Sequence, residues 1–315
     1  MPGRVHRPDR LPVVALHRLS STDAFLIVDL DGAVRADGVV RAAPKVLTDG
    51  ASTMARSRTY SWALLGEQVS GASAGINTSP EQRSERIAAF VAEVAGRVED
   101  GTLSLDAAKG VSDADLLDLV TLDHRRRDHA ELHDELLTVG ILAAAEVALG
   151  RLSGASVVIE GAGTATDALS GAFTREGAEV VDVGDGPEVA STDAELLVCG
   201  SKLGLVDHDL AAALPQRAII PCGPAPLTAK GLAVASRRSI VVMADFLTLT
   251  GPLLAFRPSE DMTRDSLRAA AGDRVREIAA EVLHHPEGPY LGAAHRAEEF
   301  LRSWRDEVPF GRPLA

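Results

Sequence analysis

The chain has 315 residues, of which 46% are hydrophobic and 24% charged, and its formal net charge is −13. This composition is typical of a globular protein and excludes a mainly disordered chain. The chain has no run of about 20 apolar residues, so we expect no membrane span. The acidic balance disfavours nucleic acid and anionic membranes as partners, because both carry negative charge.

The length favours two domains. The two cysteines, Cys199 and Cys222, lie in apolar stretches and form no metal-ligand pattern, so we expect no metal and a reduced, cytoplasmic protein. Residues 1–10 carry charges and prolines and lack the apolar segment of a secretory signal.

In the first half of the chain, apolar spacing predicts a strand at 24–31 and helices at 51–65, 87–98 and 113–119. The polar run at 123–129 contains three arginines and two histidines and predicts an exposed connection between two halves. Metal binding by these histidines is the alternative interpretation.

The second half alternates strands and helices. The predicted strands are 156–160, 179–183, 195–199, 218–221 and 239–243, and the predicted helices include 138–149, 166–176, 265–283 and 291–304. This alternation is typical of a doubly wound parallel sheet. The regular alternation of strands and helices begins only after the polar run. This difference predicts an α/β fold with two domains around a cleft, at about 1–130 and 131–285, of which the second is Rossmann-like.

A glycine-rich turn lies between a predicted strand and a predicted helix, as the dinucleotide-binding fingerprint requires. Gly161 permits the tight turn, and Gly163 lets backbone amides approach a pyrophosphate. Thr164, Ala165 and the helix that starts at Thr166 complete the predicted cradle, although Thr166 stands where a third glycine is usual. A plain structural turn is the alternative.

An acidic residue follows the next strand. Asp185 lies 22 residues after Gly163 and is placed to accept hydrogen bonds from a ribose hydroxyl, whereas Asp182 lies within the strand and is the poorer candidate. Because a carboxylate repels a 2′-phosphate, we expect NAD and regard NADP as the weaker alternative.

Residues 38–76 carry a further pattern. Its positions are Arg41, Pro44, Met54, Thr59, Tyr60, Ser61, Ala63, Gly66 and a glycine-rich turn at 70–76. The pattern resembles the GxR, proline, MTxK and GGxKGGI motifs of the glutamate/leucine/phenylalanine/valine dehydrogenases, and a looser likeness extends to about residue 304.

The resemblance implies an oxidoreductase of amino-acid-like or imine substrates that forms a homo-oligomer. It also implies an N-terminal α/β domain of the dimerisation type, on which residues 286–315 pack back. The family's ionisable catalytic positions are changed, however: its two lysines are Ser61 and Ser73, its aspartate is Ala108, and its asparagines fall at Leu249 and near Pro224. General acid–base catalysis and charge stabilisation are each worth roughly 10²–10⁴-fold, so we expect no ordinary oxidative deamination.

Two hypotheses remain. In the first, the chain is a repurposed oxidoreductase in which Ser61, Ser73 and Lys109 face an imine or an activated carbonyl substrate. In the second, it is a non-catalytic binding, regulatory or scaffold subunit, in which the two serines fill space and Lys109 faces solvent.

Overall fold

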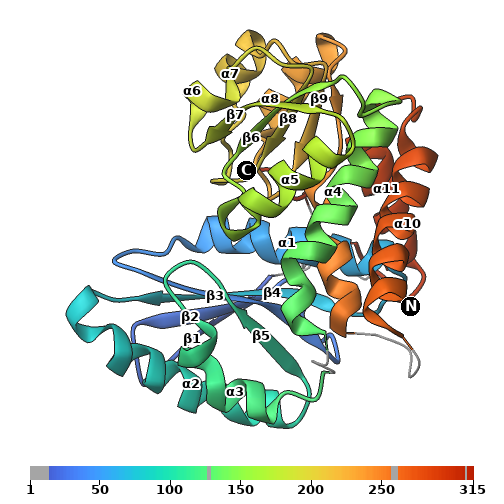
Figure 1. The fold of residues 1–315 in the computed structure, drawn as a ribbon. Coiled ribbons are helices and arrows are strands. Elements are labelled where there is room, and N and C mark those ends of the chain that lie inside the picture. Colours follow the sequence, from blue (N-terminus) through green and yellow to red (C-terminus); the bar gives the residue numbers. More distant parts are fainter. Residues whose placement is uncertain (1–13, 126–128, 257–261, 309–310) are drawn as a thin grey trace, which may run out of the picture.

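The computed structural model describes residues 14–125, 129–256, 262–308 and 311–315, which form two sheets, one above the other in Figure 1. The first sheet has the order β1-β2-β4-β3-β5, in which β1–β2 and β2–β4 are antiparallel and β3 runs parallel to β4 and β5. Its strands are β1 (Ala15–Arg18), β2 (Ala24–Val28), β3 (Ala36–Ala43), β4 (Ser70–Asn77) and β5 (Leu103–Ala107).

Helices cover both faces of this sheet (Figure 1). Helix α1 (Thr48–Leu64) packs so closely on β4 that a Cβ at Gly71 would lie 1.8 Å from the carbonyl oxygen of Ala55. The opposite face is covered by α2 (Arg83–Glu99) and α3 (Leu117–Leu122), which follow the 3₁₀ turns η1 (Pro80–Gln82) and η2 (Asp113–Leu116).

The second sheet is entirely parallel, with the order β10-β9-β8-β6-β7. Its strands are β6 (Ser156–Glu160), β7 (Glu179–Gly184), β8 (Leu196–Cys199), β9 (Ala218–Pro221) and β10 (Val241–Val242). The connections contain η4 (Gly163–Ala165), α5 (Thr166–Arg175), α6 (Pro187–Ala190), α7 (His208–Ala213) and α8 (Ala229–Arg237). The strand order reverses between β6 and β8, which is where a doubly wound sheet binds ligands.

The remaining helices join the two sheets. They are η3 (Ala130–Leu132), α4 (His133–Leu149), α9 (Asp245–Thr248), η5 (Gly251–Phe256), α10 (Arg264–Val282) and α11 (Pro289–Arg302). Tyr60 of α1 meets Phe246 edge-on at 5.2 Å between ring centroids, and Phe246 meets Tyr290 of α11 at 5.4 Å. One hydrophobic core therefore extends from α1 into the second sheet.

The C-terminal segment contacts both parts of the molecule. The Tyr60 hydroxyl donates to Glu298 of α11 at 3.3 Å, and the backbone N–H of Ala315 donates to the Leu227 carbonyl at 3.0 Å.

The structure confirms the α/β fold with a Rossmann-like parallel sheet, while two local expectations are wrong. Residues 70–76 form the central strand β4 and not a turn, because Gly71 admits α1 at close range. In the polar run, the side chains of Asp123 and Arg125 are 3% and 13% exposed, because they pair with each other and with other carboxylates. Residues 126–128 of that run lie outside the described part.

Candidate functional site

A cavity of about 280 Å³ lies between the first sheet with α1 and the helices and loops of the second half. Small and apolar side chains dominate its wall. Four of the five positions at which this chain departs from the dehydrogenase motifs meet there: Ser61, Ala108, Pro224 and Leu249. The substitutions are therefore clustered in space, although they are spread over 189 positions of sequence (61 to 249, inclusive).

The charged groups of the cavity wall are already paired. Arg58 Nε donates to Asp37 Oδ2 at 2.6 Å, and Arg58 Nη2 lies 3.5 Å from Asp106 Oδ2. His133, whose side chain is 60% exposed, pairs with Asp134 at 2.9 Å. Among the described lining residues there is no lysine and no carboxylate, so the wall offers no free cation to an acidic substrate.

Cys222 contributes a thiol rather than a thiolate to the wall. Burial, followed by the nearby charge of Glu160, raises the pKa of this thiol to about 12. Since the thiolate is the nucleophilic form, Cys222 does not serve as a nucleophile near neutral pH.

A buried acid reaches the cavity through a hydroxyl. Ser57 lines the cavity, and its Oγ donates to Oδ2 of Asp245 at 2.5 Å. Asp245 is completely buried at the start of α9; its Oδ2 also accepts the Ala225 N–H at 2.8 Å, and its Oδ1 has no hydrogen-bond partner within the described chain. Burial raises the pKa of Asp245 to about 6. The sequence analysis missed this pair, whose members are 188 residues apart.

The three serine and lysine candidates do not meet at one point. Ser61 lines the cavity, and its Oγ donates to the Ser57 carbonyl at 3.2 Å. Ser73 is fully buried in β4, outside the lining of this cavity, and its Oγ has no partner within the described chain. Lys109 is exposed and lies outside the lining as well.

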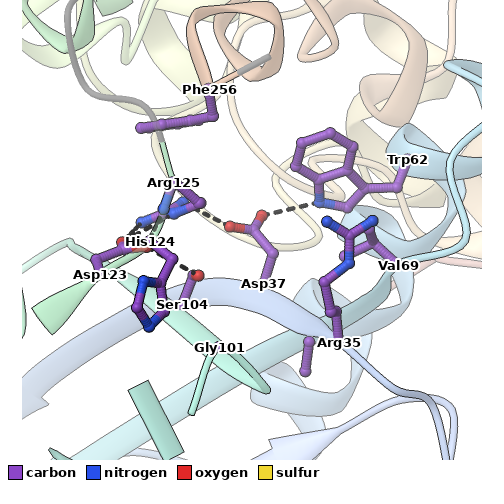
Figure 2. A pocket seen from close by; sticks show the side chains of 11 residues that line it. Arg35, Asp37, Trp62, Val69, Gly101, Ser104, Asp123, His124, Arg125 and Phe256 are labelled. Carbon is purple, nitrogen blue, oxygen red and sulfur yellow. Dashed lines mark hydrogen bonds and ion pairs between the residues drawn. The ribbon is translucent and has the colours of Figure 1, made fainter. Parts of the chain in front are cut away.

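Figure 2 shows a second cavity, of about 200 Å³, on the other side of Asp37. There the Trp62 indole N–H donates to Asp37 at 2.8 Å, and Arg125 donates to Asp37 and to Asp123, each at 2.6 Å. The Arg125 guanidinium also stacks on Phe256, 4.2 Å from the ring centroid. This ion network fixes the Asp37 carboxylate that holds Arg58 at the first cavity.

The glycine turn leaves the backbone at the start of α5 open to solvent. Gly161 and Gly163 adopt positive φ angles of 67° and 56°, and a Cβ at Gly163 would meet nothing within 4 Å. Helix α5 has no side-chain cap at its N-terminus. Thr164 is exposed, while Ala165, Leu169 and Phe173 carry the packing of this segment, so Thr166 does not have to pack closely. These residues fit an anionic group at the start of α5.

A buried carboxylate lies beneath this turn. Glu160, at the end of β6, accepts backbone N–H groups from Gly186 at 2.9 Å, Gly200 at 3.1 Å and Ser201 at 3.2 Å. It thereby fixes the loops after β7 and β8 at the point where the strand order reverses.

Asp185 is exposed immediately after β7, and the N–H of Gly161 donates to the carbonyl of neighbouring Gly184 at 2.8 Å. The predicted ribose-binding residue thus lies beside the glycine turn. Asp182 instead accepts a hydrogen bond from Thr192 at 2.8 Å.

The histidines of the polar run contact carbonyl oxygens: His124 that of Glu99, and His129 that of Met262. No helix of the described chain combines the length and apolarity that a membrane crossing requires.

Together, the mixed first sheet and the parallel second sheet define an α/β protein with a Rossmann-like part. Comparison with solved structures makes this more specific. The hetero-hexameric glutamate dehydrogenase of Thermus thermophilus, described in a leucine-bound form, is similar with a TM-score of 0.77 and 20% identity over 96% of this chain and 90% of that one.

Two further dehydrogenases show the same likeness. The L-tryptophan dehydrogenase of Nostoc punctiforme has a TM-score of 0.66 and 16% identity over 93% of this chain and 96% of that one. The glutamate dehydrogenase of Plasmodium falciparum has a TM-score of 0.73 and 14% identity over 89% and 77%. No family model and no curated protein matches the sequence. The chain therefore has the fold of the amino-acid dehydrogenases, as its motifs predict.

Proposed function

We propose that this chain reduces a small, largely apolar imine or activated carbonyl compound with a nicotinamide cofactor and does not deaminate common amino acids. The Ser57–Asp245 hydrogen bond carries this proposal, because it brings an acid to a cavity that no lysine lines and whose charged side chains, Arg58 and His133, are already paired. When bound, a reduced nicotinamide supplies hydride.

The chain's own residues supply position and a proton. The amides of Gly163 and Thr164 with the start of α5 would hold the pyrophosphate, and Asp185 would hold the ribose. As hydride reaches the carbon of the C=N group, its nitrogen takes up the π-electron pair and a proton from Ser57 Oγ. In its protonated form Asp245 would donate from Oδ2 to Ser57 Oγ, the reverse of the hydrogen bond that the charged carboxylate accepts, and so return a proton to Ser57. Because Asp245 has a pKa of about 6, the rate is expected to fall as the pH rises above 6.

The test is oxidation of NADH and NADPH with a panel of cyclic imines and aldehydes. Ser57→Ala is expected to lower kcat by about 10²-fold or more, because a general acid typically contributes that much. Ser61→Ala is the matched control one turn along α1, since its hydroxyl bonds only to a carbonyl of its own helix. Equal losses in both variants, or none in either, would contradict the role given to Ser57.

A non-catalytic subunit is the second candidate function, favoured by the negative charge around the glycine turn. Glu160 occupies three backbone N–H groups there. A hydrogen bond with His133, and to a lesser degree one with Thr164, holds the pKa of nearby Asp134 low. The similar Thermus thermophilus enzyme is a hetero-hexamer, so this fold occurs in assemblies with unlike subunits.

Nucleotide titration separates the two candidates. The reductase binds NADH, and Gly163→Val abolishes that binding because its side chain fills the open space above the turn. If millimolar NADH and NADPH both give no binding signal, the chain acts as the non-catalytic subunit. For the reductase we propose a homo-oligomer, which light scattering of the purified chain tests.

A further inference from the structure

Two histidines and a glutamate form a cluster where α10 turns into α11, outside both cavities discussed above. One ring nitrogen each of His285 and His295 and a carboxylate oxygen of Glu287 all lie within 4.8 Å of one another. The His295 ring nitrogen Nε2 lies 2.7 Å from Glu287 Oε2, and the two imidazole centroids are 5.3 Å apart. The proposed reductase function uses none of these groups.

The local backbone holds the cluster in place. After α10, the N–H of His285 donates to the Val282 carbonyl at 3.0 Å, and the N–H of Gly288 donates to the His285 carbonyl at 2.8 Å. The Glu287 N–H donates to Nδ1 of His285 at 3.2 Å. Gly288 then turns the chain with a φ of 90°, and α11 carries His295 back to the loop.

We propose that His285, Glu287 and His295 bind one divalent transition-metal ion of the zinc type, with water completing the coordination. Two imidazoles and one carboxylate are a common ligand set for such ions. Bonds of about 2.0–2.1 Å place tetrahedral ligand atoms roughly 3.4 Å apart, so the separations here need only small side-chain movements. The ion takes the place of the proton that His295 and Glu287 share.

The surroundings of His295 suit a metal ligand. Its other ring nitrogen, Nδ1, lies 3.8 Å from the carboxylate of Glu298, so a small side-chain movement would form the hydrogen bond that orients a metal-binding imidazole. Arg312 lies 3.5 Å from the same nitrogen and opposes a cation, but its Nε is already bonded to Glu298 at 2.8 Å. The site therefore joins the α10–α11 loop to the body of α11.

Calorimetric titration of zinc into the full chain, purified without a histidine tag and stripped with chelator, tests the proposal. We expect one zinc ion per chain at micromolar affinity, and at least tenfold weaker binding in His285→Ala and in His295→Ala. His284→Ala is the matched control, since His284 is exposed next to the cluster but outside it. His208→Ala controls for the fully exposed group Asp207, His208 and Asp209.

Cobalt(II) absorption gives a second measurement that does not depend on heat. A cobalt spectrum that is present in the wild type and the two control variants, and lost in the two cluster variants, supports the site. Absence of binding in the wild type overturns the proposal and leaves an ordinary His295–Glu287 ion pair. Unchanged binding in both cluster variants overturns it too.

Discussion

Replacing Asp245 by asparagine is expected to change how stability depends on pH. The carboxyl is fully buried, and burial raises its pKa from the ordinary 3.8 to about 6, although hydrogen bonds from Ser57 and Ala225 oppose this shift. Between these two pH values the folded chain keeps a proton that the unfolded chain has lost. Protonation therefore favours the folded state at low pH, and this advantage is lost as the pH rises through 6.

The magnitude follows from the shift. About two pH units at about 1.4 kcal/mol each give a destabilisation of about 3 kcal/mol when the group is fully charged, of which about half develops between pH 5 and pH 8. Urea unfolding at several pH values in this range measures it. The free energy of unfolding of Asp245→Asn, relative to the wild type, is expected to rise by about 1–2 kcal/mol from pH 5 to pH 8.

Two variants complete this experiment. Asp209→Asn changes a carboxylate that is 86% exposed, and its pH profile is expected to parallel that of the wild type. Ser57→Ala removes a hydrogen bond that lowers the pKa of Asp245, so it is expected to steepen the pH dependence. Parallel profiles for Asp245→Asn and the wild type would refute the reasoning, because the carboxyl would then titrate alike in both states.

Three further predictions concern packing, ion pairing and cofactor choice. Gly71→Ala is expected to lower the free energy of unfolding by about 3 kcal/mol, because the added Cβ meets the Ala55 oxygen. The control Gly96→Ala lies in open space on α2 and is expected to raise this free energy by up to about 1 kcal/mol. Equal effects of the two variants in urea unfolding would contradict this prediction. Arg125→Met removes a buried partner of several carboxylates and is expected to cost about 3–5 kcal/mol in the same assay, and a loss below about 1 kcal/mol would show that the network is not structural. Asp185→Ser is expected to raise NADPH affinity relative to NADH in a fluorescence titration, and an unchanged ratio would place the ribose elsewhere.

The second sheet was largely predictable, because its strands are short apolar runs that end at glycines or other turn residues. β6 and β9 have the predicted bounds, and α5 begins at the predicted residue. The first sheet was harder to predict, since β3 contains Asp37 and Arg41 and β4 consists mainly of small residues. Their place in a sheet depends on contacts with α1 and on ion pairs with distant residues, which no local pattern records.

The candidate site was also only partly predictable from local sequence patterns. Family motifs led to Ser61 and Ala108, and the structure brings both to one cavity. Ser57 lies in the same helix but outside the motif, and Asp245 follows the predicted strand 239–243, where its acidic side chain was the one available signal. Only the fold shows that the two side chains meet.

The aromatic contacts of α1 with α9 and α11 have a consequence for how ligands are exchanged. A movement of α1 away from these two helices would separate Tyr60 from Phe246 and expose both rings, which are fully buried, to water. Such opening is therefore rare compared with movement of exposed groups at the rim. Among the described residues of the cavity wall His133 is the exposed one, so bulk at that residue is expected to slow the entry and release of small molecules more than it changes the equilibrium affinity.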